Sequence, residues 1–180
     1  MADLTFRTAT ASDVPAVAAL VERAYRGPVA ANGWTTETEL LAGPRTSERH
    51  VAELAAEPGS RFVLAEADGA LVGSALVQAP DAPGGPAYLG MFAIDPAYQG
   101  GGLGKAVVAA AERTVADLWG APAVRLTVIS LRAELIEWYE RRGFVRTGRH
   151  LPFPFHEASG ALRTDFDLVE MQKDLGPTPT

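Results

Sequence analysis

The feature that most constrains this chain is a run of glycines between a strand-like segment and a helix-forming one. Residues 87–94 are mostly apolar, and residues 103–119 repeat apolar side chains at helical spacing. Between them lies Gln99-Gly100-Gly101-Gly102-Leu103-Gly104. Glycines at such a junction let the backbone turn sharply and approach a ligand closely. The sequence therefore predicts a strand, a glycine loop and a helix in succession.

The start of the predicted helix at residue 103 is an expected anion site. Backbone N–H groups in a first helical turn lack intrahelical partners, and the helix dipole adds partial positive charge. Phosphate or pyrophosphate is the natural ligand. Three interpretations remain: a plain glycine-rich turn, a Rossmann dinucleotide loop and a coenzyme A pyrophosphate loop. The Rossmann interpretation ranks third, because it expects an acidic residue about 20 positions further on, where this chain has Val124-Arg125-Leu126.

Size and composition indicate an ordinary folded protein. With 180 residues, 47% of them hydrophobic and 21% charged, the chain is long enough to bury one core. We expect a single domain over residues 1–176 and a frayed tail at 177–180. The formal net charge of -6 argues against nucleic acid as a partner. No leader-like segment and no apolar run of ~18 residues is present, so a cytoplasmic location without membrane contact is expected.

The absence of cysteine narrows the possible chemistry. Thiolate nucleophiles, disulfides and Cys-ligated zinc sites are excluded. The three histidines, at positions 50, 150 and 156, have no recognisable metal-ligand spacing, so we expect no metal site. Catalysis is left to oxygen and nitrogen groups or to a cofactor.

Hydrophobic patterning predicts an α/β (α+β) fold with a central, mixed, mostly antiparallel sheet of about six to seven strands and about four helices. Asp68-Gly69 between two apolar runs predicts a hairpin turn, and Gly143 predicts a left-handed helix end. Strands are expected at 4–8, 62–65, 71–77, 87–94, 124–129, 144–147 and 164–173, and helices at about 14–25, 47–57, 103–119 and 133–142. A turn or short helix is expected at 36–41.

Two motifs in this chain resemble those of the GNAT acetyltransferases. The family's loop signature is Q/R-x-x-G-x-G/A, and a later signature is Tyr-x-x-x-Gly-Phe. The matching residues are Gln99, Gly102 and Gly104 for the first, and Tyr139, Gly143 and Phe144 for the second. The order of predicted elements agrees as well, so the resemblance extends over residues 4–175.

This resemblance implies a GNAT-like fold with acetyl-CoA as cosubstrate and no metal. The strand at 87–94 would separate from the strand at 124–129, and the pantetheine arm would lie in the V-shaped gap. A backbone N–H near Phe92 would polarise the thioester carbonyl. Arg132 stands where the family often has asparagine, and only its location near the arm or the acceptor is carried over. The expected cofactor-binding residues are Phe92, Ala93, Ile94, Gln99, Gly100, Gly101, Gly102, Leu103, Gly104, Lys105 and Arg132.

The resemblance also implies direct transfer of acetyl to a primary amine in a ternary complex. Tyr139 is the expected general acid for the departing thiolate, although an aromatic residue on an amphipathic helix is often a core residue. An amine with a pKa of about 10.4 must lose a proton before it attacks. The strand at 87–94 lacks the glutamate that many family members carry. Glu37 and Glu39 are the candidate bases, with solvated surface charge as the simpler interpretation of each.

The acceptor stays open at the level of sequence. The acidic net charge favours a cationic amine, such as a polyamine, an aminoglycoside or a basic peptide, whereas Arg45 is a candidate clamp for a substrate carboxylate. Other candidate lining residues are Trp34, Trp138, His156, Glu157 and the phenylalanines near Pro152. The alternatives are a non-catalytic coenzyme A binding or sensing module and an acyltransferase that uses another acyl-CoA. Exposed sheet edges also allow a homodimer.

Overall fold

The computed structural model describes residues 4–26, 37–155 and 160–176. Across these residues, seven strands form one sheet in the order β1-β2-β3-β4-β5-β7-β6. The strands are β1 (Leu4–Thr8), β2 (Ser60–Ala67), β3 (Ala70–Gln78), β4 (Ala87–Ile94), β5 (Ala123–Ile129), β6 (Val145–Leu151) and β7 (Leu168–Asp174). The helices are α1 (Val14–Arg26), α2 (Glu48–Ala56), α3 (Leu103–Trp119) and α4 (Ala133–Glu140), with 3-10 turns η1 (Ala11–Asp13) and η3 (Pro96–Tyr98).

The predicted fold class is confirmed. Every neighbouring pair of strands is antiparallel except β4 and β5, which run parallel and are connected in sequence through α3. The predicted hairpin turn is present, with φ of 50° at Asp68 and 79° at Gly69, the positive values that a tight two-residue hairpin requires. Gly143 ends its helical turn with φ of 89°, as predicted.

Five predicted boundaries were wrong by two residues or more, two of them the ends of β2, which spans Ser60–Ala67 rather than 62–65. Helix α4 ends at Glu140, because residues 141–143 already form the turn into β6. Strand β6 continues to Leu151, paired with β7. Strand β7 begins at Leu168 rather than at Thr164, because its pairing with β5 begins there, opposite Ile129.

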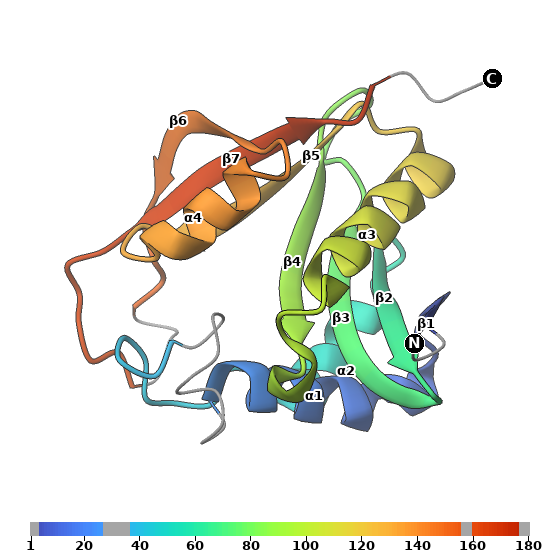
Figure 1. Ribbon diagram of the computed structural model, residues 1–180. Coiled ribbons are helices and arrows are strands. Elements are labelled where there is room, and N and C mark those ends of the chain that lie inside the picture. Colours follow the sequence, from blue (N-terminus) through green and yellow to red (C-terminus); the bar gives the residue numbers. More distant parts are fainter. Residues whose placement is uncertain (1–3, 27–36, 156–159, 177–180) are drawn as a thin grey trace.

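The helices cover both faces of the sheet, with α1 and α2 on one face and α3 and α4 on the other (Figure 1). Strand β2 shows the division, since Val63 and Ala65 pack with α3 while Phe62 and Leu64 pack with α1. Alternation of this kind is what a sheet buried on both faces requires. The site described below lies where this two-sided core is interrupted.

A β-bulge reverses the alternation in β4. Leu76 pairs with Gly90 and Ser74 with Ala93, so three steps along β4 match two steps along β3. Leu89 and Phe92 therefore face the same side although they are three residues apart, and Met91 faces the other side with φ of 42°. Positive φ at a residue other than glycine is uncommon and strained, and such strain collects at functional sites.

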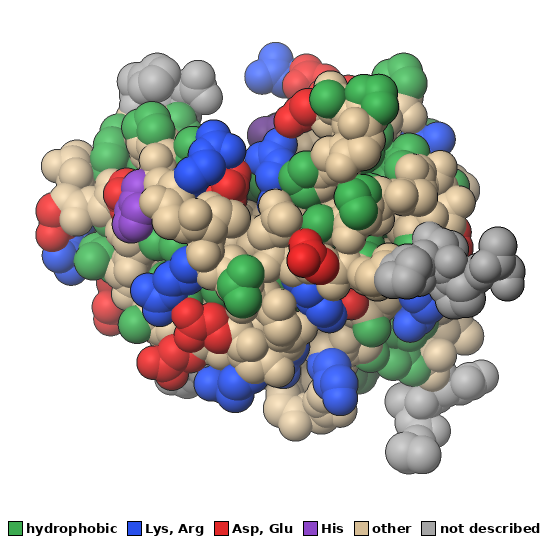
Figure 2. Space-filling model, turned by 90° about the horizontal axis from the view of Figure 1, so that it is seen from above, with side chains coloured by type: hydrophobic (Ala, Val, Ile, Leu, Met, Phe, Trp, Pro, Cys, Tyr) green, Lys and Arg blue, Asp and Glu red, His purple; other side chains and the backbone are tan. Residues whose placement is uncertain are grey.

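The surface carries both signs of charge. On the face shown in Figure 2, basic and acidic side chains lie interspersed with hydrophobic ones rather than gathered in one basic field. No helix in the described part of the chain combines the length and apolar character that crossing a bilayer requires.

Candidate active site

A cavity lies between β4 and β5, where the sheet opens. These strands are paired at only two positions, Ala87 with Val124 and Tyr88 with Arg125, and then diverge (Figure 1). The cavity has a volume of about 670 Å³. Its walls include residues 88–92 of β4 and residues 126–129 of β5, with further residues from α1, α4 and the segments at 41–50 and 153–154. This is the V-shaped gap that the sequence analysis expected.

The glycine loop leads from β4 into α3 with its backbone donors unused. Gly100 and Gly102 have φ of 92° and 81°, a region that favours glycine. The backbone N–H groups from Gly100 to Lys105 donate to no acceptor in residues 4–26, 37–155 or 160–176, and the first helical bond runs from Ala106 N–H to Gly102 O at 3.1 Å. A continuous run of unused donors at a helix N-terminus can bind a phosphate or pyrophosphate group.

Polar contacts hold this loop against β4. The Asp95 carboxylate accepts a hydrogen bond from the Ala97 N–H at 3.0 Å and pairs with Arg23 of α1 at 3.0 Å. The Gln99 side chain donates to the carbonyl oxygen of Ile94 at 3.5 Å. The side chain of Lys105 is exposed and borders a groove with Glu112, Arg142 and Lys173 between α3 and the end of α4.

Tyr139 lines the cavity and is held by aromatic neighbours. Its ring contacts Trp138 at 5.1 Å, Phe144 at 5.3 Å and Phe92 at 6.3 Å between centroids. Its hydroxyl makes no hydrogen bond within the described residues. Burial raises the pKa of Tyr139 well above 10, with smaller raising effects from the phenols of Tyr25 and Tyr88. Tyr139 therefore keeps its proton throughout the physiological pH range.

Tyr25 connects α1 to the bulge of β4. Its hydroxyl donates to the carbonyl oxygen of Phe92 at 2.5 Å, and burial is the main cause that raises its pKa to about 12. The contact fixes the backbone of the bulge at the edge of the cavity. Sequence reasoning missed this role, because Tyr25 has the helical spacing of an ordinary core residue.

The absence of a glutamate in the middle of β4 has a steric counterpart. A Cβ atom at Gly90 would lie 2.7 Å from Cε1 of Tyr88, so the tyrosine ring occupies the space beside this glycine. Both residues line the cavity. A phenol thus lies next to the position that lacks a carboxylate, and the sequence alone carried no signal for it.

The two candidate bases differ in placement. Glu37 lines the cavity with a largely buried side chain, paired with Arg26 at 3.3 Å and with Arg45 at 4.0 Å. Glu39 is exposed and is not among the lining residues. The structure therefore brings only Glu37 to the cavity.

The remaining predicted residues divide into four groups. Phe92, Arg132, Phe153 and Pro154 line the cavity. Ala93 and Ile94, the last two residues of β4, do not line it, and neither does the loop from Gln99 to Lys105, which follows the strand. Trp138 packs beside Tyr139 beneath the guanidinium of Arg142, which lies 3.3 Å from its ring centroid. Trp34, His156 and Glu157 lie outside the described residues.

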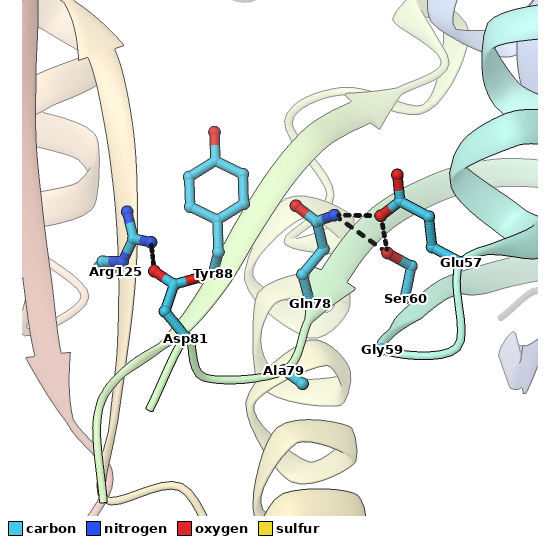
Figure 3. Close-up of a pocket in the computed structure, with 8 residues that line it drawn as sticks. All are labelled: Glu57, Gly59, Ser60, Gln78, Ala79, Asp81, Tyr88 and Arg125. Atoms are coloured by element: carbon cyan, nitrogen blue, oxygen red, sulfur yellow. Dashed lines mark hydrogen bonds and ion pairs between the residues drawn. The ribbon is translucent and has the colours of Figure 1, made fainter. Parts of the chain in front are cut away.

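A second, shallower depression of about 410 Å³ lies at the closed end of the gap (Figure 3). Its polar side chains, apart from Tyr88, are paired with one another. Gln78 donates to Glu57 at 3.1 Å and to Ser60 at 3.0 Å, while Arg125 pairs with Asp81 at 2.8 Å. These groups are already satisfied, so the first cavity is the better candidate site. Within the described residues, no group of three or more His, Asp or Glu side chains could hold a metal ion.

Comparison with known proteins now identifies the family. The sequence model of the Acetyltransferase (GNAT) family matches residues 29–144. The chain belongs to the GNAT acetyltransferase family. It is accordingly an acyltransferase, of a family that uses acetyl-CoA. No curated protein sequence matches the chain.

Solved structures share the GNAT fold over nearly the whole chain. A GNAT-family protein from Desulfovibrio desulfuricans, described as a putative acetyltransferase, is 24% identical with a TM-score of 0.71, covering 97% of this chain and 100% of its own. A ribosomal-protein alanine N-acetyltransferase from Escherichia coli is 20% identical with a TM-score of 0.70, covering 98% and 97%. A mutant spermidine N-acetyltransferase from Vibrio cholerae is 19% identical with a TM-score of 0.69, covering 96% and 94%.

Proposed function

We propose that this chain is an acetyl-CoA-dependent N-acetyltransferase that acts on a primary amine of a small molecule or peptide. One juxtaposition carries the proposal. Among the described residues, a run of backbone donors at the start of α3 has no acceptor and lies beyond one end of the β4–β5 gap, while the Tyr139 hydroxyl, which makes no hydrogen bond there, lines the cavity in that gap. The first can bind a pyrophosphate, and the second can donate a proton to a leaving group. Residues 1–176 would form a single domain.

In the proposed complex, the pyrophosphate of acetyl-CoA accepts hydrogen bonds from the N–H groups between Gly100 and Lys105. The pantetheine arm follows β4 past Ile94 and Ala93 and brings the thioester to the bulge at Phe92. The bulge, fixed by Tyr25, supplies a backbone N–H toward the thioester oxygen. Preorganised donors of this kind stabilise the oxyanion of a tetrahedral intermediate.

The proposed reaction is direct transfer. The lone pair of the neutral amine attacks the carbonyl carbon, the carbon–sulfur bond breaks as the intermediate collapses, and Tyr139 gives its proton to the departing thiolate. The amine proton leaves to Glu37 through water or to solvent. The absence of cysteine supports this order, since no thiol is available to form an acyl-enzyme.

Structural neighbours support an amine acceptor without indicating which one. The two named above with stated acceptors act on an alanine of a ribosomal protein and on spermidine. These acceptors share only an amine. A cytoplasmic location, the lack of a nucleic-acid or membrane partner, and a homodimer stay predictions.

The test is release of free thiol from acetyl-CoA with a panel of amines, amino acids and peptides, comparing the parent chain with Tyr139→Phe. We expect amine-dependent release whose kcat falls by about 10²- to 10⁴-fold in the variant, the usual contribution of a general acid. Affinity for acetyl-CoA should be retained, because the variant removes one hydroxyl from the cavity wall. Activity should not fall at alkaline pH below about 10, because burial raises the pKa of Tyr139 above that value.

Other outcomes point elsewhere. Tight acetyl-CoA binding without release by any panel member would favour the non-catalytic coenzyme A module. Release with a longer acyl-CoA but not with acetyl-CoA would change the donor. Equal rates in Tyr139→Phe and the parent chain would remove Tyr139 from the mechanism.

A further inference from the structure

The charged residues around the cavity differ in sign from the chain as a whole. The chain has a formal net charge of -6. Among the described residues, the cavity lining contains four guanidinium groups and one carboxylate: Arg26, Arg45, Arg49 and Arg132 against Glu37. Residues 27–36 contain no charged side chain, and residues 156–159 add only one glutamate and one histidine. The net charge of the cavity lining is therefore positive whether or not the glutamate of residues 156–159 is counted.

The four arginines have different surroundings. Arg26 already has partners within the protein, since it pairs with Glu37 and donates to the carbonyl oxygen of Gly43 at 2.7 Å. Arg49 is 89% exposed at the side chain and pairs with Glu53. Arg132 is buried and pairs with Glu134 at 2.6 Å. Each of these three has a charged partner within hydrogen-bonding range or lies largely in solvent.

Arg45 is the cation best placed to bind a ligand. Its guanidinium lies over the ring of Tyr25, 5.2 Å from the centroid, and its contact with Glu37 is long, at 4.0 Å. Its side chain is about one-third exposed, and its terminal nitrogens make no hydrogen bond within the described residues. The hydroxyl of Tyr25 donates to the carbonyl oxygen of Phe92, so the Tyr25 ring lies between Arg45 and the bulge of β4.

Part of the cavity wall is apolar. Leu41, Phe153, Pro154 and Leu168 line the same cavity, and the rings of Phe153 and Phe166 lie 4.9 Å apart behind them. A ligand that presents an anion to Arg45 has this apolar wall available in the same cavity for an apolar substituent. A polycationic ligand would meet a cation instead, and like charges at close range are unfavourable.

We infer that the acceptor is a small amino acid whose carboxylate binds Arg45 while its amine faces the bulge of β4. The carboxylate accepts two hydrogen bonds from the planar guanidinium, a geometry that lysine does not offer. The side chain of the amino acid packs against the apolar wall. This inference rests on the proposed N-acetyl transfer and reverses the cationic acceptor that the net charge of the chain favoured.

The test compares matched acceptors in matched variants. L-leucine, L-methionine and L-phenylalanine are each assayed beside the corresponding carboxamide, in the parent chain and in Arg45→Gln. We expect the acid-to-amide ratio of kcat/KM to fall by about 10- to 100-fold in Arg45→Gln, the range for loss of a charged hydrogen bond. The amides themselves should change little. The α-amine of an amino acid amide has a lower pKa than the α-amine of the free acid, so a larger fraction of it is neutral and able to attack at the same pH. A preference for the free acid would therefore reflect binding of its carboxylate and not a larger supply of neutral amine.

Two further variants separate the clamp from general damage. Arg45→Lys keeps the positive charge but loses the planar guanidinium that donates two parallel hydrogen bonds. Its acid-to-amide ratio should therefore lie between those of Arg45→Gln and the parent chain. Arg146→Gln on β6 removes an arginine that is 54% exposed, pairs with Glu140 and lines none of the cavities described here, so it should leave the ratio unchanged. Equal losses for acid and amide in Arg45→Gln would overturn the inference.

The remaining outcomes distinguish this inference from the proposed function. If amides and simple amines release thiol but the acids do not, the carboxylate site is wrong and N-acetyl transfer stands. If no acceptor releases thiol, the enzyme–CoA complex is titrated calorimetrically with the same amino acids. Binding that Arg45→Gln abolishes would then support an anion site without transfer, and absence of binding would refute it.

Discussion

A single hydroxyl at residue 25 ties a helix to the strained part of a strand. Tyr25 of α1 donates to the carbonyl of Phe92 inside the bulge of β4. Tyr25→Phe removes this buried hydrogen bond, and we expect it to lower the free energy of unfolding by about 1 kcal/mol. We also expect kcat/KM to fall, because the bulge loses its tether. Urea denaturation and thiol release measure the two effects.

Tyr98→Phe is the control for stability, since Tyr98 on η3 is exposed, with 43% of its surface accessible. It should change the free energy of unfolding by less than about 0.5 kcal/mol. A Tyr25→Phe protein with unchanged stability and unchanged activity would contradict the tether.

At the residue scale, motifs in the sequence pointed to a residue that lines the cavity and to a left-handed glycine before α3, while their roles stay predictions. Tyr139 and Gly102 were predicted because their spacing matches a family signature. Tyr25 and Tyr88 were not, because their partners at Phe92 and Gly90 are brought close only by the bulge and the packing of α1. Glu37 and Glu39 were indistinguishable in sequence, and the turn at 37–40 places only Glu37 at the cavity.

At the scale of the element, α3 has a left-handed glycine at each end, Gly102 with φ of 81° and Gly120 with φ of 56°. A Cβ atom would meet nothing within 4 Å at either position, so the two sites differ in location and not in crowding. Alanine should cost about 1 kcal/mol or more of stability at each end. Only Gly102→Ala should weaken acetyl-CoA binding, because it alters the donors at the N-terminus.

Calorimetric titration with acetyl-CoA and urea denaturation of both variants test this prediction. Equal affinities in Gly102→Ala and Gly120→Ala would place the pyrophosphate elsewhere.

Element types and order were predictable, whereas the irregular parts were not. Helix α3 begins and ends as predicted, since Gly102 and Gly120 flank a clear apolar repeat. The bulge in β4 was not predicted, because Leu89, Met91 and Ala93 suit a regular strand equally well. Strand β7 was predicted to begin too early, because only pairing with β5 determines where it starts.

At the scale of the whole molecule, one carboxylate joins the first strand to the first helix. Asp13 accepts two hydrogen bonds from Arg7 of β1, at 2.7 and 2.8 Å, and one from the Thr10 N–H at 2.7 Å, while Arg7 also pairs with Glu66 of β2. The bonds from Arg7 are the main cause that lowers the pKa of Asp13 in the folded state. Its contribution to stability is therefore present above its unfolded pKa of about 3.9 and is lost as pH falls below it.

We expect Asp13→Asn to lower the free energy of unfolding by about 1 kcal/mol at pH 7, the usual effect of losing a helix cap. The difference from the parent chain should shrink as the pH falls below about 4, where the carboxylate is protonated in the unfolded chain. Urea denaturation across this range measures it. Asp117→Asn, at an exposed position of α3, is the control and should show no such trend. A difference that stays constant with pH would show that charge is not involved.

Because β4 and β5 diverge, a ligand bound between them would also connect the two parts of the sheet. Strand β5 is bonded to β7 along its whole length, but to β4 at only two positions, so the molecule is two half-sheets joined at one end. An extended ligand with amide groups, laid between them, would act as an inserted strand and continue the backbone hydrogen bonding across the gap. Because such a ligand binds only the folded chain, it stabilises the fold by mass action. The cosubstrate would then complete the sheet that positions it for reaction.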